Sequence, residues 1–418
     1  MATTVQTPLR TIISRLLNHK IDHSYHPHFE DLVVKPFTNI LPLLTGFTLL
    51  AGVLLLIHIS IPQAEPYTSK FLLLSHRQPS TGLYSIGNGD VCFVLFEVLT
   101  LVGLREGCMK YLLAPFARAM GVSKERKVVR FSEQGWVLMY YSLIWTKSSH
   151  FSDMDQLWID WPQRDVDGLI KFYILTQLAY WIQQVISVNI EARRKDYWLN
   201  VVHHFITITL ILLCYVYHHT RVGSLILVMM DAIEILFPFA KCLRYLGFTT
   251  LCDVVFCIFF ITWIISRHVL YLMTCWSVYS HVPRIIEPSC FMGSANDLHG
   301  PLPVPDDWWH LIEPWLHPKG IVCHSDNFRV SILAYLLVLQ VLMMIWFGFI
   351  CKVAIGVLRG SAADDVRSDV ESDEEDSESV ANGSGWQQSQ LQPGRCVDSN
   401  GAAQMVDGGK NKIHCKEE

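Results

Sequence analysis

Long apolar runs recur along this chain, and they constrain its fold more than any other feature. Of the 418 residues, 51% are hydrophobic and only 17% are charged. An apolar run of about 20 residues spans a bilayer as an α-helix, whose backbone satisfies its own hydrogen bonds. The sequence therefore predicts an all-α fold, a polytopic transmembrane helical bundle of about eight spans. We place the spans at 41–61, 90–116, 133–149, 168–190, 199–219, 221–246, 250–278 and 328–356.

The charges of the connecting segments support this number of spans. The connections 117–132 and 191–198 are rich in Lys and Arg, whereas 62–89, 150–167 and 279–327 are poor in them. Basic connections stay on the cytosolic side of a membrane. The alternation therefore favours eight spans with both termini in the cytosol, and it makes the long, Pro-rich connection 279–327 lumenal.

Two cysteines, Cys290 and Cys323, lie in this lumenal connection. An oxidising lumen permits a disulfide between them. Sequence alone does not place the two sulfur atoms within bonding distance, so their pairing stays open.

The two ends of the chain differ from its apolar body. Residues 1–40 are polar and are predicted to form a cytosolic N-terminal segment, and residues 41–126 hold the first two spans with their basic connection. The tail, 357–418, is predicted to be disordered, because from Ser361 onward it has 13 acidic and 5 basic residues and few large apolar ones.

Serines in the acidic tail are candidates for phosphorylation. The pattern of acidic residues that follow or flank them is typical of substrates of acidophilic kinases, and an unregulated, solvated tail is the alternative. The candidate positions are Ser368, Ser372 and Ser377.

Polar side chains interrupt the two adjacent apolar runs between Asn200 and Gly247. His203 and His204 lie near the start of the first run, and Asp231 and Glu234 lie inside the second. Ionisable groups are costly in a membrane and usually face a bundle interior or a cavity, so these four are candidate catalytic residues. Thr207 lies three and four residues after the histidines, on the same helix face. Pro238 is predicted to kink the second helix beside its carboxylates.

A histidine and a carboxylate on neighbouring membrane helices suit acyl transfer. The carboxylate orients the imidazole, which takes a proton from a nucleophilic amine or hydroxyl. Alternatively, one histidine is the nucleophile and carries the acyl group transiently.

Other interpretations of these residues stay open at this point. The histidines are also compatible with a structural role between helices, and the carboxylates with an ion or proton pathway. A metal site is disfavoured, because the spaced histidine clusters of membrane di-iron enzymes are lacking. Arg267 and His268, in the seventh span, are interpreted as cavity groups or as a site for a lipid head group or phosphate. No basic, aromatic-rich motif points to nucleic acid.

The stretch from Arg194 to Gly247 resembles the Lag motif of ceramide synthases, within the TLC domain. The matching elements are RKDY, the His203–His204 pair with Thr207, the RVG that begins at Arg221, Asp231 with an acidic residue three positions later, and the AK that ends at Lys241. The resemblance extends from about 127 to 352, and we assign 127–356 to a TLC catalytic domain. Met230 and the acidic tail are similar to the fungal branch of the family.

This resemblance implies a sphingosine N-acyltransferase of the endoplasmic reticulum membrane. It would transfer an acyl chain from acyl-CoA to the amine of a sphingoid base, with no bound cofactor. His203, His204 and Asp231 match the essential residues of the family, whereas Glu234 stands where a second Asp is usual. Thr207 or the second histidine would donate a hydrogen bond to the developing oxyanion.

The resemblance also implies partners. CoA would stay on the cytosolic side, near the basic residues Arg193, Arg194, Lys195, Lys241 and Arg244. Membrane lipids surround the spans, and a homo- or heterodimer or a small accessory subunit is compatible with the family. The competing hypothesis is a non-enzymatic TLC-domain lipid sensor, transporter or translocation-associated protein.

Overall fold

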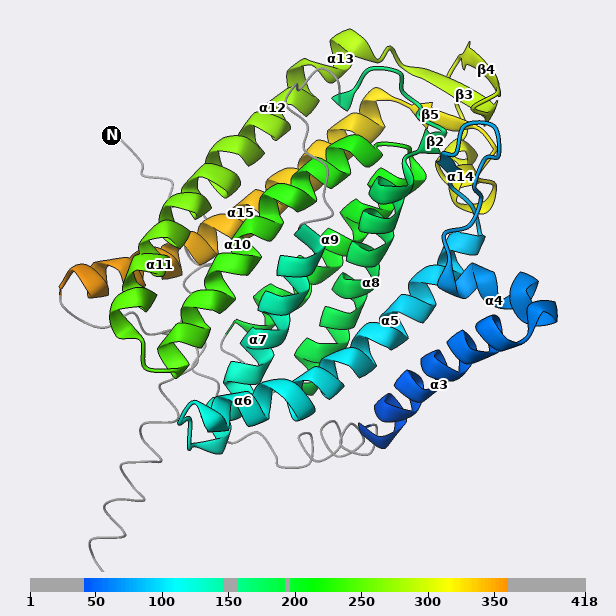
Figure 1. Ribbon diagram of the computed structural model, residues 1–418. Helices are drawn as coiled ribbons and strands as arrows, with labels where there is room; N and C mark the ends of the chain where they lie inside the picture. Colours follow the sequence, from blue (N-terminus) through cyan, green and yellow to red (C-terminus); the bar gives the residue numbers. More distant parts are fainter. Residues whose placement is uncertain (1–40, 146–156, 192–195, 360–418) are drawn as a thin grey trace, which may run out of the picture. The chain divides into compact units, whose positions relative to one another are not determined.

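The computed structural model describes residues 41–145, 157–191 and 196–359. This part of the chain is dominated by long helices (Figure 1). The helical elements are α3 (Leu41–Ser60), η1 (Pro62–Ala64), α4 (Glu65–Leu72), α5 (Gly89–Cys108), η2 (Met109–Leu113), α6 (Ala114–Ala119), α7 (Glu125–Trp145), α8 (Gly168–Ile190), α9 (Tyr197–Val216), α10 (Thr220–Tyr245), α11 (Thr249–Trp263), η4 (Ile264–Leu270), α12 (Tyr271–Ser280), α13 (Val282–Ile285), η5 (Trp309–Leu311), α14 (Glu313–Leu316) and α15 (Asp326–Leu358). The strands are β1 (Tyr84–Ser85), β2 (Asp165–Val166), β3 (Ser289–Ser294), β4 (Asp297–Leu302) and β5 (Val322–His324).

Each of the eight predicted spans corresponds to a helical segment. The largest shift is in the third, where α7 begins at Glu125, inside the connection predicted for 117–132, and ends at Trp145. The predicted end of that span, 146–149, lies outside the described residues. The seventh span is a continuous run of α11, the π-helical η4 and α12.

Four of these helices are long and apolar enough to cross a membrane, namely α9, α10, the run Thr249–Ile285 and α15. A bent pair, Leu49–Ser60 with Pro62–Leu72, raises the number to five if it counts as one span. The chain is therefore a multi-pass helical protein by length and composition, and the full set of eight spans stays a prediction. The helices α5, α7 and α8 bury polar side chains, among them Arg105, Glu133 and Lys171.

A buried ion pair shows how these polar helices pack. Lys171 of α8 is fully buried, and its Nζ lies 2.7 Å from Oδ1 of Asp90 on α5. The same ammonium donates to the carbonyls of Ser75 and Ser85 at 2.9 and 2.8 Å. Tyr215 of α9 donates its hydroxyl to the other oxygen of Asp90 at 2.8 Å. A buried charge is tolerated only with such partners, so this cluster fixes α5, α8 and α9 together.

The helices that carry the candidate catalytic residues lie side by side. α9 contacts α8, α10 and α15, and α10 also contacts α7 and α11 (Figure 1). The short turn between α9 and α10 contains His218 in a left-handed conformation, with φ of 60°. α10 continues as a helix through Pro238 to Tyr245. The helix is therefore continuous at Pro238, and the kink predicted there stays a prediction.

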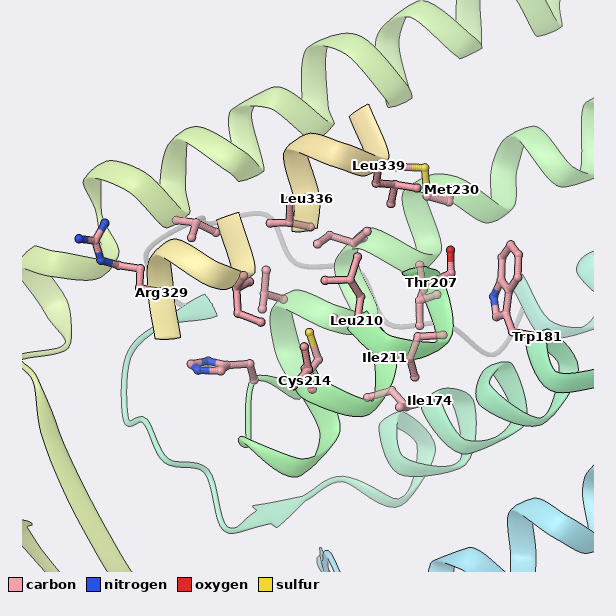
Figure 2. A pocket seen from close by; sticks show the side chains of 18 of the residues that line it. Ile174, Trp181, Thr207, Leu210, Ile211, Cys214, Met230, Arg329, Leu336 and Leu339 are labelled. Atoms are coloured by element: carbon pink, nitrogen blue, oxygen red, sulfur yellow. The ribbon is translucent and has the colours of Figure 1, made fainter. Parts of the chain in front are cut away.

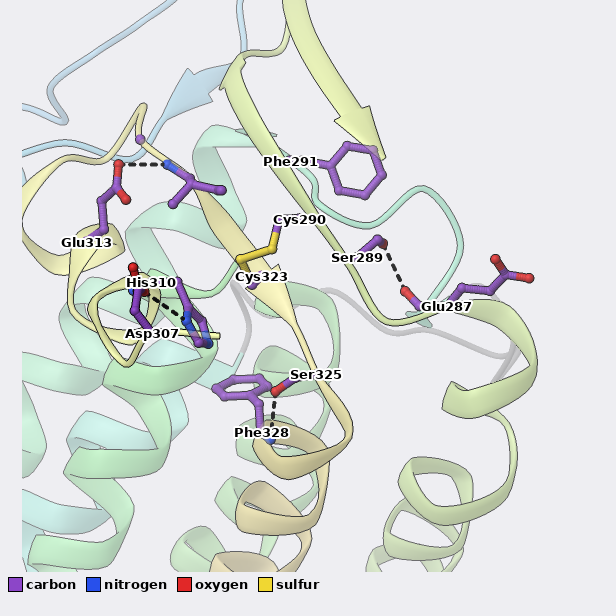
Figure 3. The surroundings of a disulfide bond; sticks show 12 residues. Glu287, Ser289, Cys290, Phe291, Asp307, His310, Glu313, Cys323, Ser325 and Phe328 are labelled. Atoms are coloured by element: carbon purple, nitrogen blue, oxygen red, sulfur yellow. Dashed lines mark hydrogen bonds and ion pairs between the residues drawn. A yellow bond between two sulfur atoms is a disulfide. The ribbon is translucent and has the colours of Figure 1, made fainter. Parts of the chain in front are cut away.

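The connection between α12 and α15 is not the irregular loop of an all-α fold. It contains an antiparallel sheet in the order β4-β3-β5, and a second small sheet pairs β1 with β2. The prediction of an all-α fold is wrong at these two places, because strands of two to six residues give no long alternating pattern. Cys290 and Cys323 are opposite each other on β3 and β5 and form a disulfide (Figure 3).

Arg164 fixes this sheet-containing connection to the segment before α8. Its guanidinium is buried and donates to the carbonyls of Phe291, Pro318 and Gly320 at 2.9 to 3.0 Å. Burial lowers the pKa of Arg164 to about 10. One guanidinium thus donates to a carbonyl of β3 and to two carbonyls of the segment before β5. Two segments more than 100 residues apart in sequence are thereby joined at one end of the helices.

Candidate active site

An elongated, mostly apolar cavity lies between α8, α9, α10, η4, α12 and α15, with about 1130 Å³ of space including its open side. Along α9 its lining extends from His203 to Cys214, which is about 16 Å at 1.5 Å per residue. Figure 2 shows Leu210 and Cys214 of α9 on one side and Leu336 of α15 on the other. The guanidinium of Arg329 turns away from the centre of this cavity (Figure 2). The shape and lining suit an aliphatic chain.

The two histidines occupy different positions at one end of the cavity. His203 lines it, and its ring centroid lies 5.3 Å from that of Trp181 and 5.1 Å from that of Trp346. Nδ1 of His203 is buried without a hydrogen-bond partner among the described residues. His204 is buried beside the cavity lining, and its Nδ1 lies within hydrogen-bond distance of the carbonyl of Asn200. That bond assigns the proton of His204 to Nδ1 and leaves Nε2 as the acceptor.

Asp231 lines the same cavity from α10 and is 1% exposed. Its Oδ2 accepts from the hydroxyl of Tyr173 at 2.5 Å and from Nε2 of Gln177 at 2.6 Å. The expectation that Asp231 orients an imidazole directly is not met, because its side-chain partners are these two groups of α8. They lie one turn apart on the face of α8 that meets α10. Asp231 and His203 therefore share the cavity lining, with no hydrogen bond between them among the described residues.

Glu234 and Arg267 form an ion pair at the same end of the cavity. Oε1 of Glu234 lies 2.9 Å from Nη2 of Arg267, and both residues line the cavity. Arg267 belongs to the π-helical η4, is 4% exposed and stacks on Trp263 at 4.7 Å. A π-helical turn inside a long helix is frequent at functional sites. The pair places a cation beside the two carboxylates of α10.

His268, unlike its neighbour Arg267, does not face the cavity. Its ring nitrogens are within hydrogen-bond distance of the side chains of Gln340 and Trp263, and it is not among the residues that line the cavity. Adjacent residues on a helix point in different directions, so only one of the two predicted substrate-binding groups faces the cavity.

Thr207 lines the cavity one turn beyond His203, and its Oγ1 is buried without a partner in the described part of the chain. Other predicted site residues lie outside that part. They are Arg193, Arg194 and Lys195, and the serines Ser368, Ser372 and Ser377.

Several residues at the site were not predicted from the sequence. Tyr173, Gln177 and Trp181 follow one another at intervals of four along α8, and all three are buried. This regular spacing of polar and aromatic side chains in an apolar helix is a signal that could have revealed them. The approach of Trp346 from α15 depends on the packing of helices far apart in sequence.

No cluster of three or more His, Cys, Asp or Glu side chains is arranged to hold a metal ion within residues 41–145, 157–191 and 196–359.

Comparisons with known proteins agree with the motif. A sequence model of the TLC domain matches residues 130–352. The chain is 89% identical over 402 residues, 94% of each chain, to the protein named ceramide synthase FUM18 of Gibberella moniliformis. It is 40% identical over 311 residues, 72% of each chain, to the sphingosine N-acyltransferase-like protein ALT7 of Alternaria alternata. It is 34% identical over 326 residues, 76% of this chain and 77% of the relative, to the sphingosine N-acyltransferase lag1 of Schizosaccharomyces pombe. The resemblance predicted from the motif is confirmed, and the chain belongs to the TLC-domain family of ceramide synthases, the sphingosine N-acyltransferases.

Proposed function

We propose that this protein transfers an acyl chain from acyl-CoA to the amine of a sphingoid base, giving a ceramide. The observation that carries the proposal is the position of His203, Thr207 and Asp231 at one end of a long apolar cavity. The polar end suits the reacting groups, and the apolar length suits an aliphatic chain. The names of the relatives also favour an enzyme over a non-enzymatic lipid sensor or transporter.

In the proposed reaction, the neutral amine of the base attacks the thioester carbonyl. Its nitrogen gives a proton to the imidazole of His203, which has no competing hydrogen-bond partner on Nδ1. The imidazolium then protonates the sulfur of CoA as the carbon–sulfur bond breaks. Asp231, held by Tyr173 and Gln177, contributes negative charge that stabilises the cationic histidine and attracts the protonated base.

We further propose eight spans with both termini cytosolic, in the endoplasmic reticulum membrane. The start of α9 and the end of α10 then face the cytosol, which brings Lys241 and Arg244 close to the polar end of the cavity. These residues, with the basic segment 193–195, are proposed to bind the phosphates of CoA. A dimer or an accessory subunit and phosphorylation of the tail stay predictions from the sequence.

The experiment combines purified protein, sphinganine or phytosphingosine and acyl-CoAs of different length, with mass spectrometry of the products. We expect amide formation by the wild type and a loss of about 10²–10⁴-fold in His203→Ala, because a positioned general base contributes that much. His299→Ala, in the exposed β4, is the matched control and keeps full activity. Purified wild-type protein that binds the base but forms no amide with any acyl-CoA would contradict the proposal. Full activity of His203→Ala would remove His203 from the mechanism.

A further inference from the structure

Trp181 has a buried donor with no partner. Its indole Nε1 makes no hydrogen bond within the described residues, although the side chain is only 8% exposed. A buried N–H without an acceptor is costly, so native proteins retain few of them, and those that persist often have a functional role. A bound ligand that supplies an acceptor would remove this cost.

The position of Trp181 suggests which ligand atom it would meet. The residue lines the cavity at its polar end, and its ring centroid lies 5.3 Å from those of both His203 and His204. Figure 2 shows the indole nitrogen on the side of the ring that faces Thr207, whose own hydroxyl is also buried without a partner. Two unpartnered polar groups therefore border the place where His203 faces the cavity.

We propose that the indole N–H of Trp181 donates a hydrogen bond to the carbonyl oxygen of the acyl group during transfer, with the hydroxyl of Thr207 as a second donor. The proposal rests on the proposed N-acyltransferase function and adds a catalytic residue to it. A donor aimed at the oxygen on which charge develops stabilises the transition state more than the substrate.

In this transfer, one carbon–nitrogen bond forms and one carbon–sulfur bond breaks. The amine nitrogen forms a bond to the carbonyl carbon, and an electron pair moves onto the carbonyl oxygen. Trp181 and Thr207 stabilise the negative charge of that oxygen by hydrogen bonds. One proton passes from the nitrogen to His203. The electron pair returns as the carbon–sulfur bond breaks, and His203 gives its proton to the departing thiolate, leaving an amide and CoA.

The first test is Trp181→Phe, which keeps an aromatic ring against both histidines and removes the N–H together with the pyrrole part of the indole. We expect kcat to fall about 10²–10³-fold, the usual effect of losing one oxyanion donor, with KM for acyl-CoA nearly unchanged. Trp136→Phe is the matched control. Trp136 of α7 is also buried with an unpartnered Nε1, but it does not line the cavity, so its variant keeps wild-type kcat. Wild-type kcat in Trp181→Phe would overturn the proposal.

A second measurement separates a role in catalysis from a role in shaping the cavity. The probe is an S-alkyl-CoA thioether, which has the chain and the CoA of the substrate but no carbonyl oxygen. If Trp181 acts on that oxygen, the thioether inhibits wild type and Trp181→Phe with equal Ki. Weaker inhibition of the variant, in proportion to its loss of kcat, would show that Trp181 only shapes the cavity and would refute the proposal.

Should Trp181→Phe fail to fold, benzothienylalanine incorporated at position 181 has the shape of tryptophan without the N–H, and the same outcomes apply to it. The wild-type rate is measured in every series. If the wild type forms no amide, the proposed function is contradicted. If the wild type forms amide and the variant has the same kcat, only the role of Trp181 is contradicted.

Discussion

Asp231 and Glu234 lie three residues apart on α10, yet their side chains have different surroundings. Asp231 is buried and receives two donors from α8, whereas Glu234 is partly exposed and pairs with Arg267. A carboxyl group that accepts two short hydrogen bonds is held in one orientation. The two residues are therefore expected to contribute unequally, as the departure of Glu234 from the family pattern also suggests.

We predict that Asp231→Asn lowers kcat at least 100-fold, whereas Glu234→Gln lowers it by less than about tenfold. The amide in Asp231→Asn removes the negative charge opposite His203. The amide oxygen in Glu234→Gln still accepts from Arg267 and preserves the contact. Initial rates with sphinganine and a saturating acyl-CoA measure both effects.

Asp253→Asn, in α11 and outside the cavity lining, is the control for this pair of variants. Equal losses in Asp231→Asn and Glu234→Gln would contradict the division of roles. Glu234→Ala is expected to be less stable than Glu234→Gln, because it leaves Arg267 buried without its counter-ion.

The helix α15 holds the first histidine of α9 through one aromatic contact. The ring of Trp346 lies 5.1 Å from that of His203, and its Nε1 donates to Oδ2 of Asp196 at 3.4 Å, just before α9 begins. With Nδ1 unpartnered, His203 is oriented by packing between Trp346 and Trp181. Asp196 is thus expected to act on the reaction through Trp346.

A double-mutant cycle of Asp196→Ala and Trp346→Phe tests this connection, because alanine removes the oxygen that accepts from the indole. We expect each variant to lower kcat about tenfold and the double variant to lower it little further, because residues in one network are not additive. The pH profile of kcat should shift in the same direction in all three proteins, which a loss of stability alone would not cause. Trp276→Phe, on an exposed position of α12, is the control. Fully additive losses would show that Asp196 acts independently of Trp346.

The elements differ in how far the sequence could predict them. Apolar runs placed the helices, because the bilayer demands long hydrophobic segments whatever their neighbours are. The partners of buried polar groups could not be read in the same way. Tyr173 and Gln177 meet Asp231 only because α8 packs on α10, and Cys290 meets Cys323 only because of the register of β3 and β5. The site was therefore predictable as a set of residues on α9 and α10, but not as a set of contacts.

The orientation of the chain in the membrane decides whether the polar end of the cavity meets CoA. The disulfide of Cys290 and Cys323 fits a lumenal connection between α12 and α15, because oxidising compartments keep such bonds. The opposite side is predicted to hold the turn between α6 and α7, which contains Gly121 with φ of 91°. Both places are suited to the insertion of a glycosylation acceptor.

We predict that Leu298→Thr is N-glycosylated in a eukaryotic host and that Gly121→Asn is not. The first change completes an Asn-x-Thr acceptor at Asn296 in the exposed turn between β3 and β4, and the second creates an Asn-x-Ser acceptor ending at Ser123. Asparagine tolerates a left-handed conformation better than most residues, and open space surrounds a Cβ at position 121. A gel shift that is reversed by endoglycosidase reports the modification.

The wild-type chain supplies the control for this experiment, because its own Asn-Gly-Ser acceptor begins at Asn382, in the tail predicted to be cytosolic. It should stay unmodified. Glycosylation of Gly121→Asn, or of the wild type, would place the start of α9 and its histidines toward the lumen. Acyl-CoA, a polyanion that does not cross the bilayer unaided, would then meet the wrong end of the cavity, and the proposed delivery of the thioester to His203 would have to be abandoned.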